Sequence, residues 1–189
     1  KEDDYNIIPW LFRFNNHFYN PVNGSGLDFT TLGVHIIGYP TPNWGLEDTQ
    51  TYSEQLFSIK DARDYFYKGL TATTKNEREK NIALTFRTLG QVIHLIEDMA
   101  QPQHTRNDPH GGFFSASGGP QILGQKSRYE FYVNRDDNRN TFTYSGYPVV
   151  TFDNYRSYFE TTDGKGISQF SNRNFVTHGT NFTDLTQGN

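Results

Sequence analysis

An all-α fold is predicted by two helical patterns and by the long loops around them. The clearer pattern covers residues 75–100, where apolar residues recur at intervals of three and four until Pro102 stops the helix. Additional leucines widen this apolar stripe, so we expect a helix that is buried on more than one side. A second helix is predicted at 59–71, because Ser58 and Asp61 form a capping-box pattern ahead of apolar residues at helical spacing.

The segments around these two helices are predicted to be mainly loops. Residues 1–50 contain four prolines and a glycine-rich stretch, and 105–125 is again rich in glycine, serine and proline. Residues 1–135 form the predicted helical core, and 136–189 form an irregular, extended and aromatic-rich segment that packs on the core or on a partner. Shorter elements are expected as helices at 126–134, 150–162 and 165–175 and as a strand or extended arm at 141–150.

The composition predicts a folded domain whose core depends on aromatic side chains. The 189 residues are 34% hydrophobic and 16% aromatic, and aromatic rings bury more area per residue than small aliphatic side chains. The net charge of −4, without a run of basic residues, gives no reason to expect a polyanionic partner held by bulk charge. No stretch of about 18 apolar residues is present, so no transmembrane helix is predicted. The residue usage is typical of a secreted or cell-surface protein.

Cysteine is absent, so any zinc ion must be held by histidine and carboxylate side chains. His94 and Asp98 stand four apart on the stronger predicted helix and share a face, which suits two ligands of one metal ion. His104 follows the end of that helix and can turn back toward the same place. A hydrogen-bonded core histidine is the alternative for His94, but a buried carboxylate beside it is rare unless it is paired or binds a metal. His35, in the apolar stretch VHII, is predicted to be structural.

Four spaced motifs occur in the order found in one known family. They are an acidic EDD at 2–4, HFYNP at 17–21, HLIEDMAQPQH at 94–104 and the pair YE at 129–130. Together they resemble the motifs of the zinc-dependent phospholipase C family, which is related to the single-strand-specific zinc nucleases of fungi and plants. The resemblance covers residues 1–135, and Asn20 replaces an aspartate of the family's His-Phe-Tyr-Asp-Pro segment.

The resemblance implies an all-α fold with up to three zinc ions in a cleft. His17, His94 and Asp98 would hold one zinc ion, with Asp98 bridging to a neighbouring ion. His104 and Glu130 would hold a second ion. Zinc at these positions would activate a water molecule for attack on a phosphodiester, without a protein nucleophile.

The remaining family positions leave alternatives open. Asp3 falls at the family's acidic position, which implies a catalytic base or a ligand beside the bridging water, and Asp4 is an additional candidate ligand. Lys126 stands where the family has a histidine ligand of the second zinc, and its positive charge opposes metal binding. Either His110 or Gln125 takes its place, or the second site is empty or weakly occupied, which we expect. The family's N-terminal ligands and last helices have no counterpart, so the chain resembles a member truncated at both ends.

Two classes of function fit these observations. The first is a secreted zinc-dependent phosphodiester hydrolase, with a phospholipid head group favoured over nucleic acid as substrate. The second is a non-catalytic, zinc-stabilised binding or assembly module of an extracellular or surface structure, whose C-terminal segment contacts a partner or another copy of the chain. One to three zinc ions are expected, and two or three would favour the enzyme.

Overall fold

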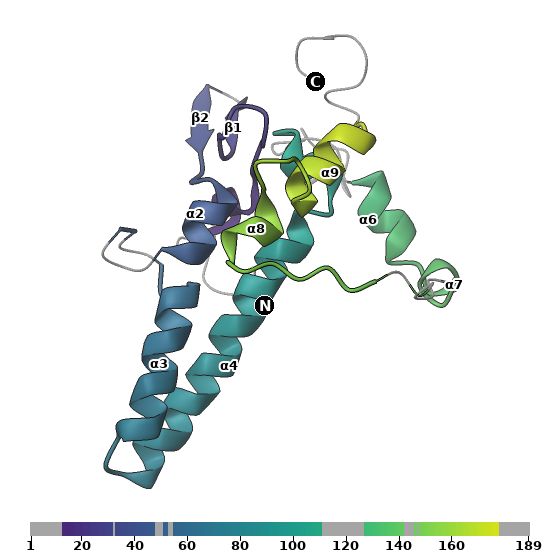
Figure 1. The fold of residues 1–189 in the computed structure, drawn as a ribbon. Coiled ribbons are helices and arrows are strands. Elements are labelled where there is room, and N and C mark those ends of the chain that lie inside the picture. The colour runs from purple at the N-terminus through teal and green to yellow at the C-terminus, as the bar shows by residue number, and fades with distance from the viewer. Residues whose placement is uncertain are drawn as a thin grey trace.

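A computed structural model describes residues 13–31, 33–47, 51–52, 55–110, 127–141, 146 and 148–177. These residues are mostly helical and include one two-stranded sheet, which agrees with the predicted helical class (Figure 1). No helix among them is long and apolar enough to cross a membrane. The elements are η1 (Asn15–His17), β1 (Asp28–Thr31), β2 (Val34–Ile37), α2 (Thr41–Leu46), α3 (Ile59–Thr71), α4 (Lys75–Asp98), α5 (Pro102–Thr105), α6 (Arg128–Val133), α7 (Asp136–Arg139), α8 (Arg156–Phe159) and α9 (Ile167–Asn174).

The helix predicted at 59–71 is confirmed as α3, and its predicted cap is formed. Ser58 Oγ accepts a hydrogen bond from the backbone N–H of Asp61 (3.2 Å), and Asp61 Oδ2 accepts one from the backbone N–H of Ser58 (2.8 Å). α3 and α4 then form a hairpin that projects from the body of the molecule (Figure 1). Ile82 packs over Gly69, where an added Cβ would come within 2.8 Å of the isoleucine side chain, so glycine allows the close approach of the helices.

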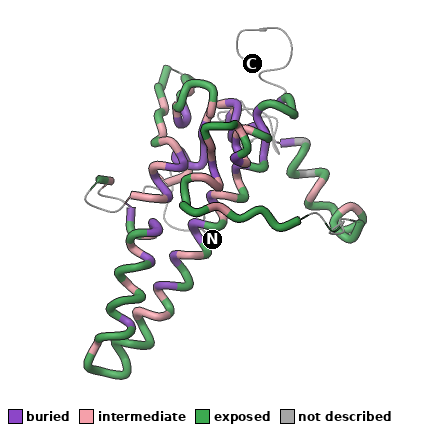
Figure 2. The backbone as a smooth tube through the Cα atoms, viewed as in Figure 1, coloured by how far each residue is buried: buried purple, intermediate pink, exposed green. Residues whose placement is uncertain are grey.

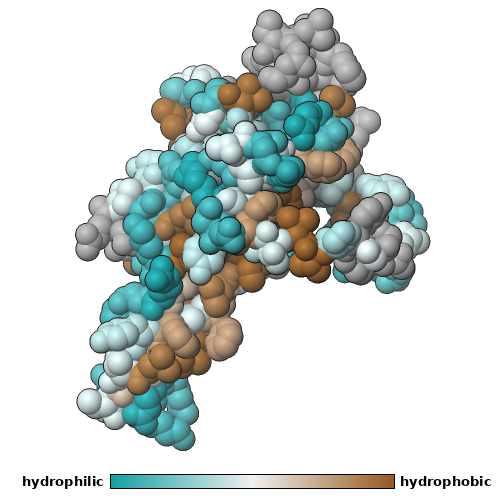
Figure 3. Space-filling view, viewed as in Figure 1, coloured by the Kyte–Doolittle hydropathy of each residue, from teal (hydrophilic) through white to brown (hydrophobic). Residues whose placement is uncertain are grey.

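α4 ends at Asp98, two residues before the predicted end, and it is buried on one side only. Phe86 is 70% exposed and Ile93 is 53% exposed, although both belong to the predicted apolar stripe. Figure 3 shows apolar surface along this hairpin. The prediction of burial on more than one side is therefore wrong, because the projecting part of α4 is covered mainly by α3 among the described elements. The buried residues of α4 are Thr85, Thr88, Gln91, Val92 and Leu95.

Residues 1–50 contain more regular structure than the predicted loop. β1 and β2 form an antiparallel hairpin in which Asp28 pairs with Ile37 and Thr31 pairs with Val34. The short helix α2 follows directly, with a proline in its first turn. Pattern could not reveal the hairpin, because the residues of β2 do not alternate between buried and exposed positions.

The core lies where the segment after η1, α2, the end of α4 and α8 meet, and Figure 2 shows buried residues concentrated there. Its members are Tyr19, Trp44, Leu95, Met99 and Phe159, each at most 3% exposed. Three of these five side chains are aromatic, which confirms the predicted dependence on aromatic packing. Because Met99 and Leu95 stand at the same end of α4 as His94 and Asp98, this core also fixes that end of the helix.

The C-terminal segment is attached to this core. The helices predicted near 126–134, 150–162 and 165–175 are present in shorter form as α6, α8 and α9. Phe159 of α8 is fully buried in the core, and the Tyr19 hydroxyl donates a hydrogen bond to Glu160. The chain leading into α8 is extended, as expected for the end of 141–150 (Figure 1).

Candidate metal centre

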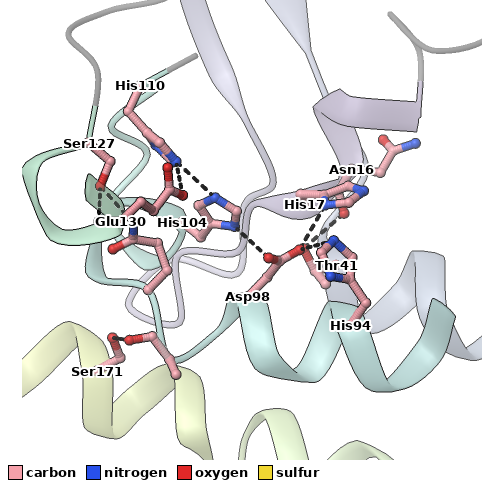
Figure 4. A network of polar contacts seen from close by, with 12 residues as sticks. Asn16, His17, Thr41, His94, Asp98, His104, His110, Ser127, Glu130 and Ser171 are labelled. Atoms are coloured by element: carbon pink, nitrogen blue, oxygen red, sulfur yellow. Dashed lines mark hydrogen bonds and ion pairs between the residues drawn. The ribbon is translucent and has the colours of Figure 1, made fainter. Parts of the chain in front are cut away.

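His17, His94 and Asp98 meet at the end of α4, and we call these three residues the Asp98 group (Figure 4). His17 Nδ1 lies 2.7 Å from Asp98 Oδ2, and His94 Nε2 lies 3.5 Å from the same oxygen. The two imidazole rings meet edge to face, with centroids 5.2 Å apart. One ligand atom from each residue lies within 4.8 Å of the others, so the group could hold a metal ion.

A second set of possible ligands lies beside the first, and we call it the Glu130 group. His104 Nε2 is 3.2 Å from His110 Nε2, and the latter nitrogen is 2.9 Å from Glu130 Oε1. These three residues also offer ligand atoms within 4.8 Å of one another. The structure thus places His110 in the second group, which the substitution at Lys126 was expected to leave one ligand short.

The Asp98 carboxylate faces both groups. Its Oδ2 is turned toward His17 and His94, whereas its Oδ1 lies 3.7 Å from His104 Nδ1. The His104 ring therefore has one nitrogen toward Asp98 and the other toward His110 (Figure 4). Asp98 and His104 join the two groups into one centre.

His17 is placed by a tightly packed segment, not by α4. The carbonyl of Asn16 accepts a hydrogen bond from Thr41 Oγ1 (2.9 Å), which ties η1 to the start of α2. The backbone of Gly38 passes so close to η1 that an added Cβ would lie 1.8 Å from the carbonyl oxygen of Asn15. Glycine is therefore required at position 38, and this close approach holds His17 against the end of α4.

His104 is fixed on two sides. Pro102 begins the single turn α5 after the end of α4, which turns the chain back toward the centre. The His104 ring stacks on Phe18, with centroids 4.7 Å apart, and its carbonyl accepts a hydrogen bond from the backbone N–H of Tyr19 (2.9 Å). The segment that carries His17 therefore also supports His104.

His110 returns to the centre through a turn at Asn107. Asn107 has a positive φ of 53°, a conformation that asparagine adopts more readily than most residues. Its side chain bonds the backbone N–H and carbonyl of Asp28 (2.9 and 2.7 Å), which anchors the turn to β1. His110 Nδ1 lies 3.1 Å from the carbonyl of Asp108, so a proton on Nδ1 leaves the Nε2 lone pair facing His104 and Glu130.

Glu130 is oriented by two residues that sequence reasoning missed. Ser127 caps α6 by accepting a hydrogen bond from the backbone N–H of Glu130 (3.1 Å). Gln101, which follows α4, donates a hydrogen bond to Ser127 Oγ (2.9 Å). The Ser-x-x-Glu spacing is a capping signal that could have indicated the start of α6. No local signal indicates Gln101, because its contact spans 26 residues.

The Asp98 carboxylate and the His104 ring have strongly shifted acidities. Burial raises the pKa of Asp98, but the charges and hydrogen bonds of His104, His17 and His94 outweigh it and lower the pKa to about 2. Burial lowers the pKa of His104 to about 4, with a smaller lowering by His110 and an opposing effect of Asp98. Near pH 7 Asp98 is therefore charged and His104 neutral, and these are the forms that bind metal ions.

His110 and Glu130 stabilise each other's charged forms. Burial lowers the pKa of His110, but the hydrogen bond and charge of Glu130 outweigh it and raise the pKa. Burial raises the pKa of Glu130, but His110 outweighs it and lowers the pKa. A metal ion would take the place of the proton that this pair shares.

The nitrogen and oxygen donors of the two groups could hold a metal ion and are of the kinds that zinc binds. His94 Nε2 and His104 Nδ1 are buried nitrogens without a hydrogen-bond partner among the described residues, and such groups are costly to leave unsatisfied. Tetrahedral ligands at about 2.0–2.1 Å from zinc lie about 3.4 Å apart, close to the 3.2 and 3.5 Å seen here. The two shorter contacts, 2.7 and 2.9 Å, would have to lengthen by about 0.5–0.7 Å. From the described residues each group could supply three ligands, the number that the protein provides in catalytic zinc sites.

The remaining residues named from the sequence are His35 and four residues that the structure does not describe. Asp3, Asp4 and Gln125, like Lys126, are outside the described residues. His35, predicted to be structural, is 53% exposed and pairs with Asp28 across the hairpin (2.7 Å), and it belongs to neither group. Comparison with protein-family models, with curated proteins and with solved structures found no match to this chain.

Proposed function

We propose that this chain is a zinc-dependent phosphodiester hydrolase, with a phospholipid head group as the favoured substrate. The observation that carries the proposal is the Asp98 carboxylate, which faces two adjacent groups of three nitrogen or oxygen ligands. Two metal ions held side by side by these groups would suit a phosphodiester, because the attacking and the leaving oxygens both need stabilisation. The resemblance of the HFYNP and HLIEDMAQPQH motifs to zinc-dependent phospholipases supports the same chemistry.

The side chains would divide the work in a defined way. Bound zinc supplies a water of lowered pKa and positive charge near the phosphoryl oxygens. Asp98 Oδ2, with His17 and His94, would hold one ion, while Asp98 Oδ1 orients the His104 ring so that its other nitrogen faces the Glu130 group. In this role Asp98 fixes His104 as well as binding metal. Asp3, from the resemblance, is the proposed base.

Metal counting and a chromogenic assay test the proposal together. The protein, equilibrated with zinc and freed of excess ion, should contain two zinc ions per chain. It should also hydrolyse p-nitrophenyl phosphorylcholine or bis(p-nitrophenyl) phosphate. His94→Ala should lower the zinc content and reduce hydrolysis by more than about 100-fold, because a direct ligand matters more than the outer-shell partners that already contribute 10–100-fold. His35→Ala, which removes an exposed histidine of the hairpin, is the matched control and should change neither quantity.

The outcomes separate the two functional classes. Bound zinc without hydrolysis of either ester would favour the non-catalytic, zinc-stabilised module. Unchanged zinc content and activity in His94→Ala would mean that the Asp98 group is not a metal site.

A further inference from the structure

The α3–α4 hairpin carries exposed apolar side chains in a row on each of its helices. On α3, Phe66 and Leu70 stand four residues apart and therefore share a side of the helix. On α4, Phe86 and Ile93 stand seven residues apart and share a side in the same way. All four are between 50 and 70% exposed, and we call them the hairpin face. Large apolar side chains grouped on a surface are typical of a place where a protein binds something.

The two rows lie on the same side of the hairpin. The contact between Ile82 and Gly69 marks the seam between α4 and α3. With 3.6 residues per turn, the α3 members of the hairpin face are turned about 60–100° from Gly69 around their helix axis. The α4 members are turned about 20–40° from Ile82, in the same rotational sense. In an antiparallel pair of helices the same sense leads to the same side, and Figure 3 shows apolar surface along the hairpin on the side in view.

The hairpin is positively charged, although the chain as a whole is negative. Residues 59–93 contain seven lysines or arginines and four aspartates or glutamates, a net charge of +3, whereas the whole chain has −4. Two of the four carboxylates form ion pairs with lysines of the hairpin, and the other two accept hydrogen bonds at the starts of the helices. The surplus positive charge therefore belongs to basic residues that the carboxylates of the hairpin do not neutralise.

Three of these basic residues border the hairpin face. In the same rotational sense as the apolar side chains, Arg63 lies about 120° from the seam on α3, and Lys80 and Arg87 lie about 140–160° from it on α4. All three are exposed and form no ion pair with another residue that the structure describes. The carboxylates on this side are Glu79, which pairs with a lysine one turn away (3.7 Å), and Glu97, in the last turn of α4. The face thus combines an apolar centre with basic edges.

The hairpin face also leads to the candidate metal centre. Ile93, its last member, directly precedes His94. The His94 side chain is 37% exposed, against 13% for Asp98 and 3% for His17, so it is the most accessible member of the Asp98 group. Anything that lies on the face at Ile93 therefore stands next to the accessible ligand of the centre.

From this arrangement we infer that the hairpin face binds a lipid surface that carries negative charge. The apolar side chains would enter the boundary between head groups and acyl chains, while the basic side chains beside them contact anionic head groups. Charge favours this partner over a second copy of the chain, because two such hairpins would bring like charges together. The inference rests on the proposed hydrolase function for its choice of a lipid partner, and it deepens that function by stating how the substrate is presented.

Sedimentation with vesicles tests the inference separately from catalysis. The protein, zinc-loaded and in parallel in excess chelator, is spun with vesicles of phosphatidylcholine alone or of equal parts phosphatidylcholine and phosphatidylglycerol. In both states it should bind the mixed vesicles at least about tenfold more tightly, because each basic residue near an anionic surface contributes about fivefold. Added salt should weaken this preference.

Variants assign the binding to the hairpin face. Phe86→Ala should weaken binding to the mixed vesicles by about tenfold, since its ring would lose burial in the lipid. Phe170→Ala removes a ring that is 54% exposed on α9 and is the matched control, with no change expected. Lys80→Gln should weaken binding by about fivefold. Lys165→Gln removes an exposed lysine outside the hairpin and should leave binding unchanged.

Several results would overturn the inference. These are binding to neither kind of vesicle, equal binding to both, and binding that is unchanged in Phe86→Ala and Lys80→Gln. Sedimentation of the protein without lipid tests the other occupant. A dimer that Phe86→Ala converts to a monomer would assign the face to a second copy of the chain.

Activity measurements separate the inference from the proposed function. Hydrolysis of soluble p-nitrophenyl phosphorylcholine without vesicle binding would overturn the lipid-binding face and leave the hydrolase standing. Vesicle binding that depends on Phe86, without hydrolysis of the ester or of the vesicle lipid, would support the face and count against the hydrolase. If both are right, Phe86→Ala should slow hydrolysis of vesicle phosphatidylcholine and leave hydrolysis of the soluble ester unchanged.

Discussion

Replacing Asp98 with asparagine is expected to destabilise the protein even when no metal is bound. Burial raises the pKa of the Asp98 carboxyl, but the effects of His104, His17 and His94 outweigh burial and lower the pKa from 3.8 to about 2. This difference corresponds to at most about 2 kcal/mol of favourable interaction at neutral pH, where His104 is neutral and the hydrogen bond between His17 and Asp98 remains. Because the pKa is lowered, the contribution is present above pH 3.8 and is lost as the pH falls toward 2. In a domain of 150–250 residues, about 2 kcal/mol corresponds to a fall in Tm of about 4–8 °C.

The assay is thermal melting at pH 7 in excess chelator and then in zinc. Asp64→Asn is the control, because Asp64 forms an exposed pair with Lys68 (2.5 Å), and exposed pairs contribute about 0.2–1 kcal/mol. Zinc should raise the Tm of the wild type, since it binds the folded state, and should raise that of Asp98→Asn less. Equal melting of Asp98→Asn and wild type in chelator would refute the electrostatic reasoning. An unchanged wild-type Tm on addition of zinc would refute a stabilising metal site.

Two further substitutions test the Glu130 group and the attachment of the C-terminal segment. His110→Ala should bind one zinc ion fewer per chain, as measured by elemental analysis, and the double variant that also carries Lys126→His should regain this ion. A full complement of zinc in His110→Ala would exclude His110 as a ligand. Phe159→Ala should cost about 3–5 kcal/mol in urea unfolding, because the ring is fully buried in the core. Phe86→Ala removes an equally large but mostly exposed ring, and an equal cost for both variants would contradict the assignment of Phe159 to the core.

The elements that could be predicted from the sequence are those whose determinants are local. α3 has the predicted bounds because its cap, Ser58 and Asp61, lies within one turn of its start. Helical periodicity showed which residues of α4 share a face, but it could not show that Phe86 and Ile93 lie where no described element covers them. The β-hairpin could not be predicted either, since its residues carry no alternating pattern and its position depends on the close passage of Gly38 over η1.

The residues of the candidate site also divide into those that local spacing or a motif predicts and those that only the fold brings into place. The spacing of His94 and Asp98 indicated a ligand pair because four residues make one helical turn. His17 was found through the resemblance of its motif, and the structure places it 2.7 Å from Asp98. The place of His110 depends on the left-handed turn at Asn107 and on its bonds to β1, and neither can be read from spacing.

The C-terminal segment supports the candidate metal centre, although the resemblance ends before it. α9 lies against the chain on both sides of His104. Asn172 Nδ2 donates a hydrogen bond to the carbonyl of Thr105 (2.6 Å), and the buried Arg106 guanidinium donates one to the carbonyl of Asn172 (2.5 Å). Ser171 Oγ donates a third bond to the carbonyl of Ala100 (3.3 Å). Helix α5 is a single turn, and the bond from Asn172 satisfies the Thr105 carbonyl at its end, which has no partner within so short a helix. The orientation of His104 toward His110 therefore depends on residues about 70 positions away in the sequence.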